Sequence, residues 1–301
     1  MQEKDSEKFC KGQIERMLRN SQTKAIMPVI TLGLLREFLS KGQQVFTDTE
    51  IGAVYKAAVK ELKIYLHHDV HIGAKYYDAY GSRMSRYGVL KSTGHLKYKL
   101  LPPYIKVARN ISEWIPARIE QHIQERLGII PSLHNVDIRT ILATDKRRFL
   151  ELMQEQIKKT PAKFEIFSFA VLRVHLEKFA CNIYRDTRTA AHDQGVDLST
   201  NFGVVYQVKK LQIHTESEAN QVYAELKVNF DNERIQNGNV ILVIDDISKE
   251  VKKYLIDMKV QSISKEDVLK LAANFDELED RQKVLRIVYE EFRREYSSRI
   301  K

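Results

Sequence analysis

Hydrophobic and polar positions along residues 164–210 first repeat with a helical period and then alternate as in a strand. Apolar side chains recur three to five residues apart at Phe164, Phe167, Val171, Val174 and Phe179. This spacing predicts one face of an amphipathic helix that carries Glu165 at its start. Residues 183–184 are β-branched and aromatic, and residues 204–209 alternate, with Val204, Tyr206 and Val208 on one face. The second pattern predicts a strand that forms a hairpin with the residues around Asp197.

The chain after this stretch continues the same kind of fold. Residues 215–229 predict an amphipathic helix, and residues 239–247 form a continuous apolar run that is typical of a central sheet strand. Helices are expected over 248–258, 265–274 and 275–299. We therefore expect an α/β fold with a mixed central sheet in α-β-β-β-α-β order and flanking helices.

The first half of the chain predicts mainly helices. The pattern indicates helices over 1–20, over 29–39, after Thr47 and over 114–127, and Thr47 or Asp48 with Glu50 can cap the third of these. We place a boundary between a helical region, 1–143, and a second domain, 144–301. A cap at Thr144-Asp145 should begin the first helix of that domain.

Residues 75–110 are basic and rich in tyrosine. Their glycines and prolines favour loops and turns over a long helix. The cations there are Lys75, Arg83, Arg86, Lys91, Lys97, Lys99, Lys106 and Arg109, against the single acid Asp78. Basic groups neutralise phosphates, and arginines can also reach base edges, so this stretch is a candidate DNA-binding surface. The alternative is a solvated basic surface whose tyrosines lie partly in the core.

The polar residues of 164–210 are expected to converge at one edge of the sheet. A carboxylate and further oxygen ligands hold Mg²⁺, which polarises a phosphate and activates water, while a lysine stabilises the developing charge. The candidate metal ligands are Asp197, the side chain of Gln207, the carbonyl of Val208 and Glu165, and Lys209 is the candidate catalytic cation. The alternative is an ordinary helix and hairpin with a surface Asp and Lys.

The motifs in this stretch resemble the PD-(D/E)xK nuclease superfamily in its Mrr-like branch. Phe164-Glu165, Gly195-Val196-Asp197 and Gln207-Val208-Lys209 carry the resemblance. The sequence departs from the broader superfamily because no proline precedes Asp197 and a glutamine replaces an acid at 207, which leaves one-metal and two-metal mechanisms open. The stretch through the apolar strand at 239–247 also resembles the HaeII-type restriction endonucleases.

The resemblance implies a type II restriction endonuclease that uses Mg²⁺ to cut double-stranded DNA. A short palindromic site, GC-rich on the HaeII resemblance, is read best by a two-fold homodimer. A companion DNA methyltransferase would protect the host site. Two alternatives stay open: a non-catalytic regulator that uses the helices of 29–66 as a helix-turn-helix, and a nuclease of the same core acting on modified DNA, RNA or junctions.

Bulk properties agree with a polyanionic partner. The chain has 301 residues, a formal net charge of +9 and a pI near 9.3, which favours nucleic acid although surplus lysine also aids solubility. The two cysteines give no disulfide framework and the N-terminus is charged. The longest apolar run, 25–35, is too short to cross a bilayer. We expect a soluble cytoplasmic protein.

Three further clusters of histidine or aspartate residues could be read as metal or catalytic sites, but we interpret them as structural. Adjacent histidines at 67–71 rarely converge on a metal, and His192-Asp193 lacks the companion residues of a His-based nuclease. Asp245-Asp246, at the end of a predicted strand, is expected to cap the following helix rather than to act in catalysis.

Overall fold

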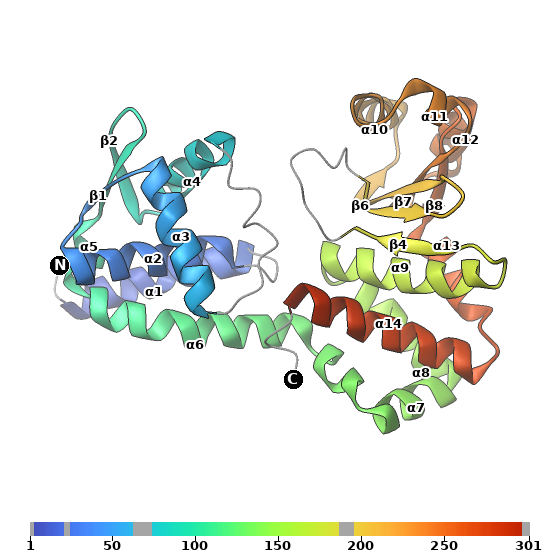
Figure 1. Cartoon of the computed structure of the whole chain (residues 1–301), viewed down its shortest axis with the longest axis horizontal. Coiled ribbons are helices and arrows are strands. Elements are labelled where there is room, and N and C mark those ends of the chain that lie inside the picture. Colours follow the sequence, from blue (N-terminus) through green and yellow to red (C-terminus); the bar gives the residue numbers. More distant parts are fainter. Residues whose placement is uncertain (1–2, 21–24, 63–73, 187–195, 297–301) are drawn as a thin grey trace. The chain divides into compact units, whose positions relative to one another are not determined.

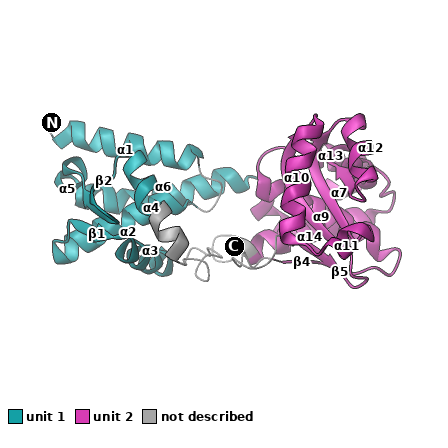
Figure 2. Cartoon of the chain, turned by 90° about the horizontal axis from the view of Figure 1, so that it is seen from above, with its two compact units in different colours: residues 1–128, 295–301 teal, residues 129–294 magenta. Residues whose placement is uncertain are grey.

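The computed structural model describes residues 3–20, 25–62, 74–186 and 196–296. Within these ranges the protein is mixed α/β and mostly helical, and it divides into two compact units, drawn in different colours in Figure 2. Unit 1 comprises residues 1–128 with 295–301, and unit 2 comprises residues 129–294. The division falls at Gly128 and not between 143 and 144, because the helix over 136–144 contacts the helix that follows it and Gln282 donates a hydrogen bond to Thr140 (2.9 Å).

Unit 1 is helical with one small sheet. Its helices are α1 (Glu3–Asn20), α2 (Ile26–Lys41), α3 (Asp48–Leu62), α4 (Ala74–Arg86), α5 (Pro102–Lys106) and α6 (Ala108–Leu127). Its strands are β1 (Val45–Thr47), β2 (Leu90–Gly94) and β3 (Lys97–Leu100), which form an antiparallel sheet in the order β1-β3-β2.

The core of unit 1 is built around α2. Every residue from Met27 to Leu35 is buried. Helix α2 approaches α3 closely at Gly33, where an added Cβ would lie only 2.5 Å from the Val54 carbonyl oxygen on α3. The predicted cap of α3 is confirmed: Glu50 accepts from the Thr47 backbone N–H (2.7 Å), and the Thr47 hydroxyl accepts from the Glu50 backbone N–H (3.3 Å).

The expectation of loops through 75–110 is wrong in two places. Gly81 lies inside α4, where a Cβ would lie only 2.3 Å from the ring of Tyr98 on β3, so the glycine is needed for helix–strand packing rather than for a turn. Pro102 and Pro103 begin α5, where proline is tolerated because the first helical N–H groups have no partner within the helix. Between them β2 and β3 form a hairpin.

Unit 2 contains a mixed sheet covered by helices. Its helices are η1 (Ile130–His134), α7 (Val136–Thr144), α8 (Lys146–Ile157), α9 (Pro161–Glu177), α10 (Glu216–Asn229), α11 (Asn232–Gln236), α12 (Lys249–Asp257), α13 (Lys265–Ala273) and α14 (Leu278–Tyr296). Its strands are β4 (Ile183–Arg185), β5 (Leu198–Thr200), β6 (Val205–Ile213), β7 (Val240–Ile247) and β8 (Gln261–Ser264), in spatial order β4-β5-β6-β7-β8.

The element order α9-β4-β5-β6-α10-β7 confirms the predicted α-β-β-β-α-β sequence, with the short α11 added before β7. Strand β5 runs antiparallel to both of its neighbours, β4 and β6, whereas β6, β7 and β8 are parallel. The predicted strand at 204–209 begins at Val205 and extends further, to Ile213, because Gln212 and Ile213 continue the pairing with β7.

Helices cover both faces of this sheet (Figure 1). Val205, Leu242 and Ile244 on one face pack with apolar residues of α10 and α12. Helices α9 and α13 contact the other face. Helix α9 begins at Pro161 with Thr160 as its cap, so Glu165 lies beyond the first turn, where the helix dipole no longer favours a carboxylate strongly. The expected placement of Glu165 at the helix start is corrected accordingly.

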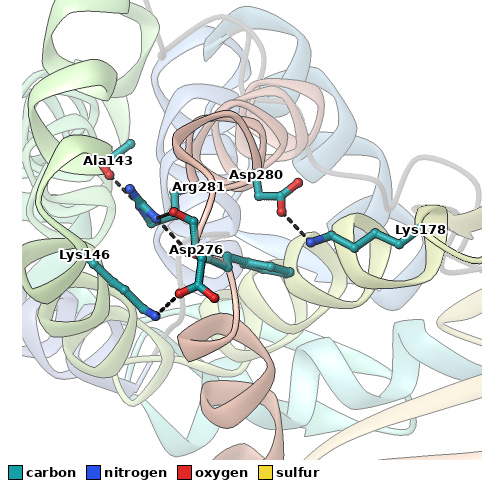
Figure 3. A network of polar contacts seen from close by, with 7 residues as sticks. Ala143, Lys146, Lys178, Asp276, Asp280 and Arg281 are labelled. Atoms are coloured by element: carbon teal, nitrogen blue, oxygen red, sulfur yellow. Dashed lines mark hydrogen bonds and ion pairs between the residues drawn. The ribbon is translucent and has the colours of Figure 1, made fainter.

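The C-terminal helix α14 is fastened at its first turns by a buried arginine (Figure 3). Arg281 donates to the carbonyls of Ala143 (2.6 Å), Phe275 (2.7 Å) and Asp276 (2.8 Å). Two ion pairs flank it, Lys146 with Asp276 (2.6 Å) and Lys178 with Asp280 (2.5 Å). These contacts fix α14 against α7, α8 and α9.

Two smaller expectations have definite outcomes. Asp145 caps α8 by accepting from the N–H groups of Arg147 and Arg148, as predicted. The expected capping role of Asp245-Asp246 is wrong, because Ser248 caps α12 and Asp245 instead pairs with Lys265 (2.7 Å). None of the helices in the described ranges combines the length and apolar character needed to cross a bilayer.

Candidate active site

The candidate site lies where strand β5 separates from strand β6. The two strands pair at Leu198–Tyr206 and Ser199–Val205. One residue before β5, main-chain pairing gives way to a side chain: the Val208 backbone N–H donates to Oδ2 of Asp197 at 2.7 Å. The sequence prediction that Asp197 lies beside the segment 207–209 therefore agrees with the structure.

The Val208 carbonyl faces the same gap. In a β-strand the N–H and C=O of one residue point to the same neighbour, and successive residues alternate between the two neighbours. The Val205 N–H donates to the Asn239 carbonyl on the β7 side (2.9 Å), whereas the Val208 N–H points to Asp197. The Val208 C=O consequently points toward Asp197 and away from β7, as the predicted ligand role requires.

Gln207 supplies a buried oxygen with no internal partner. The residue is 5% exposed, and its Oε1 accepts no hydrogen bond from any described residue. Leaving a buried acceptor unsatisfied costs about 1–3 kcal/mol, so such an atom needs an explanation. Coordination of a hard cation would explain the buried Gln207 oxygen, since amide and carbonyl oxygens suit Mg²⁺. The donor set of Asp197, Gln207 and the Val208 carbonyl fits the ion by its chemistry.

Lys209 leaves β6 toward α10. It lies on the same face as Val205 by alternation, and its Nζ is ion-paired with Glu225 of α10. Glu225 is about half exposed. Exposed pairs contribute only about 0–1 kcal/mol, so exchanging this carboxylate for a phosphate costs little.

The next residue, Lys210, has a different environment. Its Nζ donates to the Lys158 carbonyl on the α9 side. Burial lowers the pKa of Lys210, and the nearby Asp245 carboxylate opposes that shift. Adjacent lysines of one strand thus have separate roles, and only Lys209 extends from the strand face that carries Gln207.

Glu165 is held in a buried charge network on the α9 side. Arg185 of β4, whose side chain is 4% exposed, donates from Nε to Glu165 (2.6 Å) and from Nη1 to Glu291 of α14 (3.1 Å). Arg185 pairs across the sheet with Leu198, and the Asp186 N–H donates to the Asp197 carbonyl (2.9 Å). Glu165 is therefore linked to the strand beside Asp197 through an arginine that the sequence analysis did not single out.

Three partners in this site had no role in the sequence analysis. Arg185 directly follows the predicted strand residues 183–184, and its partner Glu291 is 106 residues away, a distance over which no periodic pattern operates. Glu225 does fall on the predicted helix 215–229, but its alignment with Lys209 depends on how α10 packs on the sheet.

Among the described residues no group of three or more His, Cys, Asp or Glu side chains is gathered as a metal site. The candidate set is of another kind, because two of its oxygens come from an amide and the main chain. Gly195, His192 and Asp193, together with the histidines of 67–71, lie outside the described residues.

The candidate DNA-binding residues all belong to unit 1. Arg83 and Arg86 are exposed on α4, and the carbonyl of Arg86 accepts from Arg16 (3.0 Å). The remaining exposed cations are Lys91, Lys97 and Lys99 on the hairpin, Lys106 on α5 and Arg109 on α6. Lys75 lies in α4, and its side chain is outside the described residues.

The helices of the alternative helix-turn-helix are separated by strand β1. Helix α2 has nine consecutive buried residues, while α3 exposes Lys56 and Lys60. Only α3 therefore offers a surface that could enter a DNA groove. Comparisons with protein families, curated proteins and solved structures find no match for this chain.

Proposed function

We propose that this chain is a Mg²⁺-dependent nuclease with a PD-(D/E)xK core that hydrolyses phosphodiester bonds in double-stranded DNA, as type II restriction endonucleases do. One observation carries the proposal. Where β5 leaves β6, the Asp197 carboxylate accepts from the Val208 N–H, and the preceding residue of that strand, Gln207, has a buried Oε1 with no hydrogen-bond partner among the described residues, all inside an α-β-β-β-α-β arrangement.

Asp197, Gln207 and the Val208 carbonyl would hold the ion, and Glu165, which lies on the opposite, α9 side of the sheet, would reach it only through a water. Bound Mg²⁺ supplies Lewis-acid polarisation of the phosphate and a water of lowered pKa. Arg185 orients Glu165 through the 2.6 Å ion pair. Lys209 places a positive charge beside the reacting phosphate once that phosphate replaces Glu225 as its partner.

The wider features of the proposal rest on the resemblance to restriction endonucleases. A short palindromic site, GC-rich on the HaeII resemblance, suits a homodimer, since two-fold DNA is matched by two-fold protein. A companion methyltransferase would protect the host. A cytoplasmic location agrees with this role.

The test is cleavage of phage DNA by the full chain with Mg²⁺ or EDTA, followed by sequencing of the ends. Asp197→Ala and Lys209→Ala should each lower the cleavage rate by about a hundredfold to a thousandfold, because each removes transition-state stabilisation. Asp257→Ala and Lys253→Ala, on the exposed surface of α12, are matched controls and should cut normally. Both active-site variants should still bind DNA in Ca²⁺.

Near-normal cutting by either active-site variant would contradict the assignment. A wild-type chain that binds one DNA sequence without ever cutting it would favour the regulator. Cutting confined to methylated plasmid would identify a nuclease for modified DNA.

A further inference from the structure

The three-stranded sheet of unit 1 has one apolar face and one cationic face. Phe46, Tyr98, Leu90 and Leu100 point inward and are buried. The alternate positions Lys91, Lys97 and Lys99, here called the lysine face, are exposed. Alternation along each strand explains the separation, because every second residue points to the same side. In Figure 1 the hairpin that contains β2 extends beyond the neighbouring helices of its unit.

Two of these lysines repel one another. Lys91 of β2 and Lys99 of β3 are directly opposite in the register, and like charges at opposed positions destabilise a sheet. Neither forms an ion pair or hydrogen bond with any residue in the part of the chain that the structure describes. Lys97 differs, since its charge acts on Glu50. The fold therefore keeps two adjacent positive charges that it does not neutralise.

A ribbon of this shape suits a nucleic-acid duplex. Two antiparallel strands form a unit that fits the major groove or follows its edge. Residues 91–97, which comprise most of β2, the turn and the first residue of β3, are all exposed. Opposed lysines on neighbouring strands match the repeated charges of a phosphate backbone.

We propose that the lysine face docks the phosphate backbone of double-stranded DNA and binds it independently of base sequence. The choice of double-stranded DNA as the ligand rests on the proposed function, whereas the docking surface rests on the charge pattern alone. The lysine face supplies affinity, and base reading belongs to other residues.

A competing explanation is protection of a sheet edge. Strand β2 is an edge strand, and lysine on edge strands prevents pairing with other chains. This explanation predicts aggregation on loss of Lys91, with no effect on DNA affinity. It does not account for Lys99, because β3 is the central strand.

The experiment compares the full chain with Lys91→Gln/Lys99→Gln by titrating a 20-base-pair duplex of arbitrary sequence at several salt concentrations, with EDTA present so that no DNA is cut. Each phosphate contact contributes about 0.9 to the slope of log affinity against log salt, so the variant should lose about 1.8. Between 50 and 200 mM salt its affinity should fall about twelvefold less than that of the wild type. Lys249→Gln/Lys253→Gln on α12 removes the same charge from exposed positions in unit 2 and should leave the slope unchanged.

Two further measurements keep the proposal open to refutation even if the double variant aggregates. Lys91→Arg/Lys99→Arg retains the charge and should retain the slope. In the wild type, bound duplex should protect Lys91 and Lys99 from acetylation, read by mass spectrometry. A glutamine variant with the wild-type slope, or lysines equally reactive with and without DNA, would overturn the proposal.

Measuring both cleavage and the salt slope distinguishes the proposed nuclease activity from the proposed DNA docking on the lysine face. Mg²⁺-dependent cutting with an unchanged salt slope keeps the nuclease and refutes the lysine face. A reduced slope in a chain that never cuts DNA keeps the lysine face and refutes the nuclease.

Discussion

The sheet of unit 1 leaves one face to solvent, whereas helices cover the sheet of unit 2 on both faces. The open face carries Lys91 and Lys99, which have no acidic partner among the described residues. In unit 2 the comparable cations are engaged: Lys209 with Glu225, Lys265 with Asp245, and Arg185 with two carboxylates. Charges that a fold neutralises hold its elements in place, and charges that it leaves open are available to a partner. We therefore propose positioning for Arg185 and Lys265 and binding for Lys91 and Lys99, while Lys209 keeps the catalytic role proposed above because its partner Glu225 is half exposed.

The sharpest test of positioning in unit 2 is Arg185→Ala. The change leaves Glu165 and the buried Glu291 without their cation, and breaking a buried pair in this way costs about 3–5 kcal/mol of unfolding free energy. Urea unfolding followed by far-UV circular dichroism should show that the unfolding free energy of unit 2 falls by this amount. Trp114, the only tryptophan and a residue of unit 1, should report an unchanged fluorescence transition.

Arg147→Ala is the control, since its pair with Glu151 lies on the exposed surface of α8, and it should change stability by less than about 1 kcal/mol. Equal effects of the two substitutions would show that the Arg185 network positions nothing.

The corresponding test in unit 1 is Gly81→Ala. The new methyl group would overlap the buried ring of Tyr98, and overpacking of this kind costs about 1–3 kcal/mol. The midpoint of the Trp114 fluorescence transition should fall, and the unit 2 transition should not. Gly12→Ala in α1, where nothing lies within 4 Å of the added Cβ, should instead stabilise by about 0.5–1 kcal/mol. A Gly81→Ala chain as stable as wild type would refute the close packing of α4 on β3.

Gln207→Leu separates stability from metal binding. Removing a buried acceptor that has no partner should raise the unfolding free energy by about 1–3 kcal/mol without Mg²⁺. The same variant should need much more Mg²⁺ for cleavage, while Gln207→Glu should keep the site and bind the ion more tightly. Unfolding in EDTA and a Mg²⁺ titration of cleavage measure the two effects. An unchanged titration for the leucine variant would remove Gln207 from the ligand set.

The smallest effect is expected for Glu225→Gln. The Glu225 side of its pair with Lys209 is half exposed, so unfolding free energy should change by less than about 1 kcal/mol. Urea denaturation measures this directly. A loss of several kcal/mol would mean that Lys209 is fixed by Glu225 and is not free to exchange it for a phosphate.

Local patterns predicted the parts of unit 2 that local contacts determine. Asp197 directly precedes β5 and Val208 lies in the neighbouring strand β6, so alternation and the turn between the strands were enough to bring them together. Arg185 and Glu291 meet only because α14 packs within unit 2, where its first turns are held by contacts such as that of Arg281 with Ala143 of α7. That contact depends on the packing of the whole unit, and the sequence contains no periodic signal for it.

In unit 1 the prediction from sequence failed for a different reason. Gly81 and Pro102 indicated turns, but tertiary packing places the first inside a helix and the second at a helix start. The alternation Lys97-Tyr98-Lys99-Leu100 was a usable signal for strand β3. Reading it would have shown the hairpin and the separation of lysines from the apolar face.

The direction of the Val208 peptide has a consequence for mutational scanning. The proposed ligand at this position is a main-chain oxygen, so every amino acid at 208 would supply it. A library of side-chain substitutions should therefore find Asp197 and Gln207 sensitive and Val208 permissive wherever the strand itself survives. The coordinating role of residue 208 would come to light only by altering the backbone, for example by replacing the amide between 208 and 209 with an ester, which weakens the carbonyl as a donor while leaving the side chain unchanged.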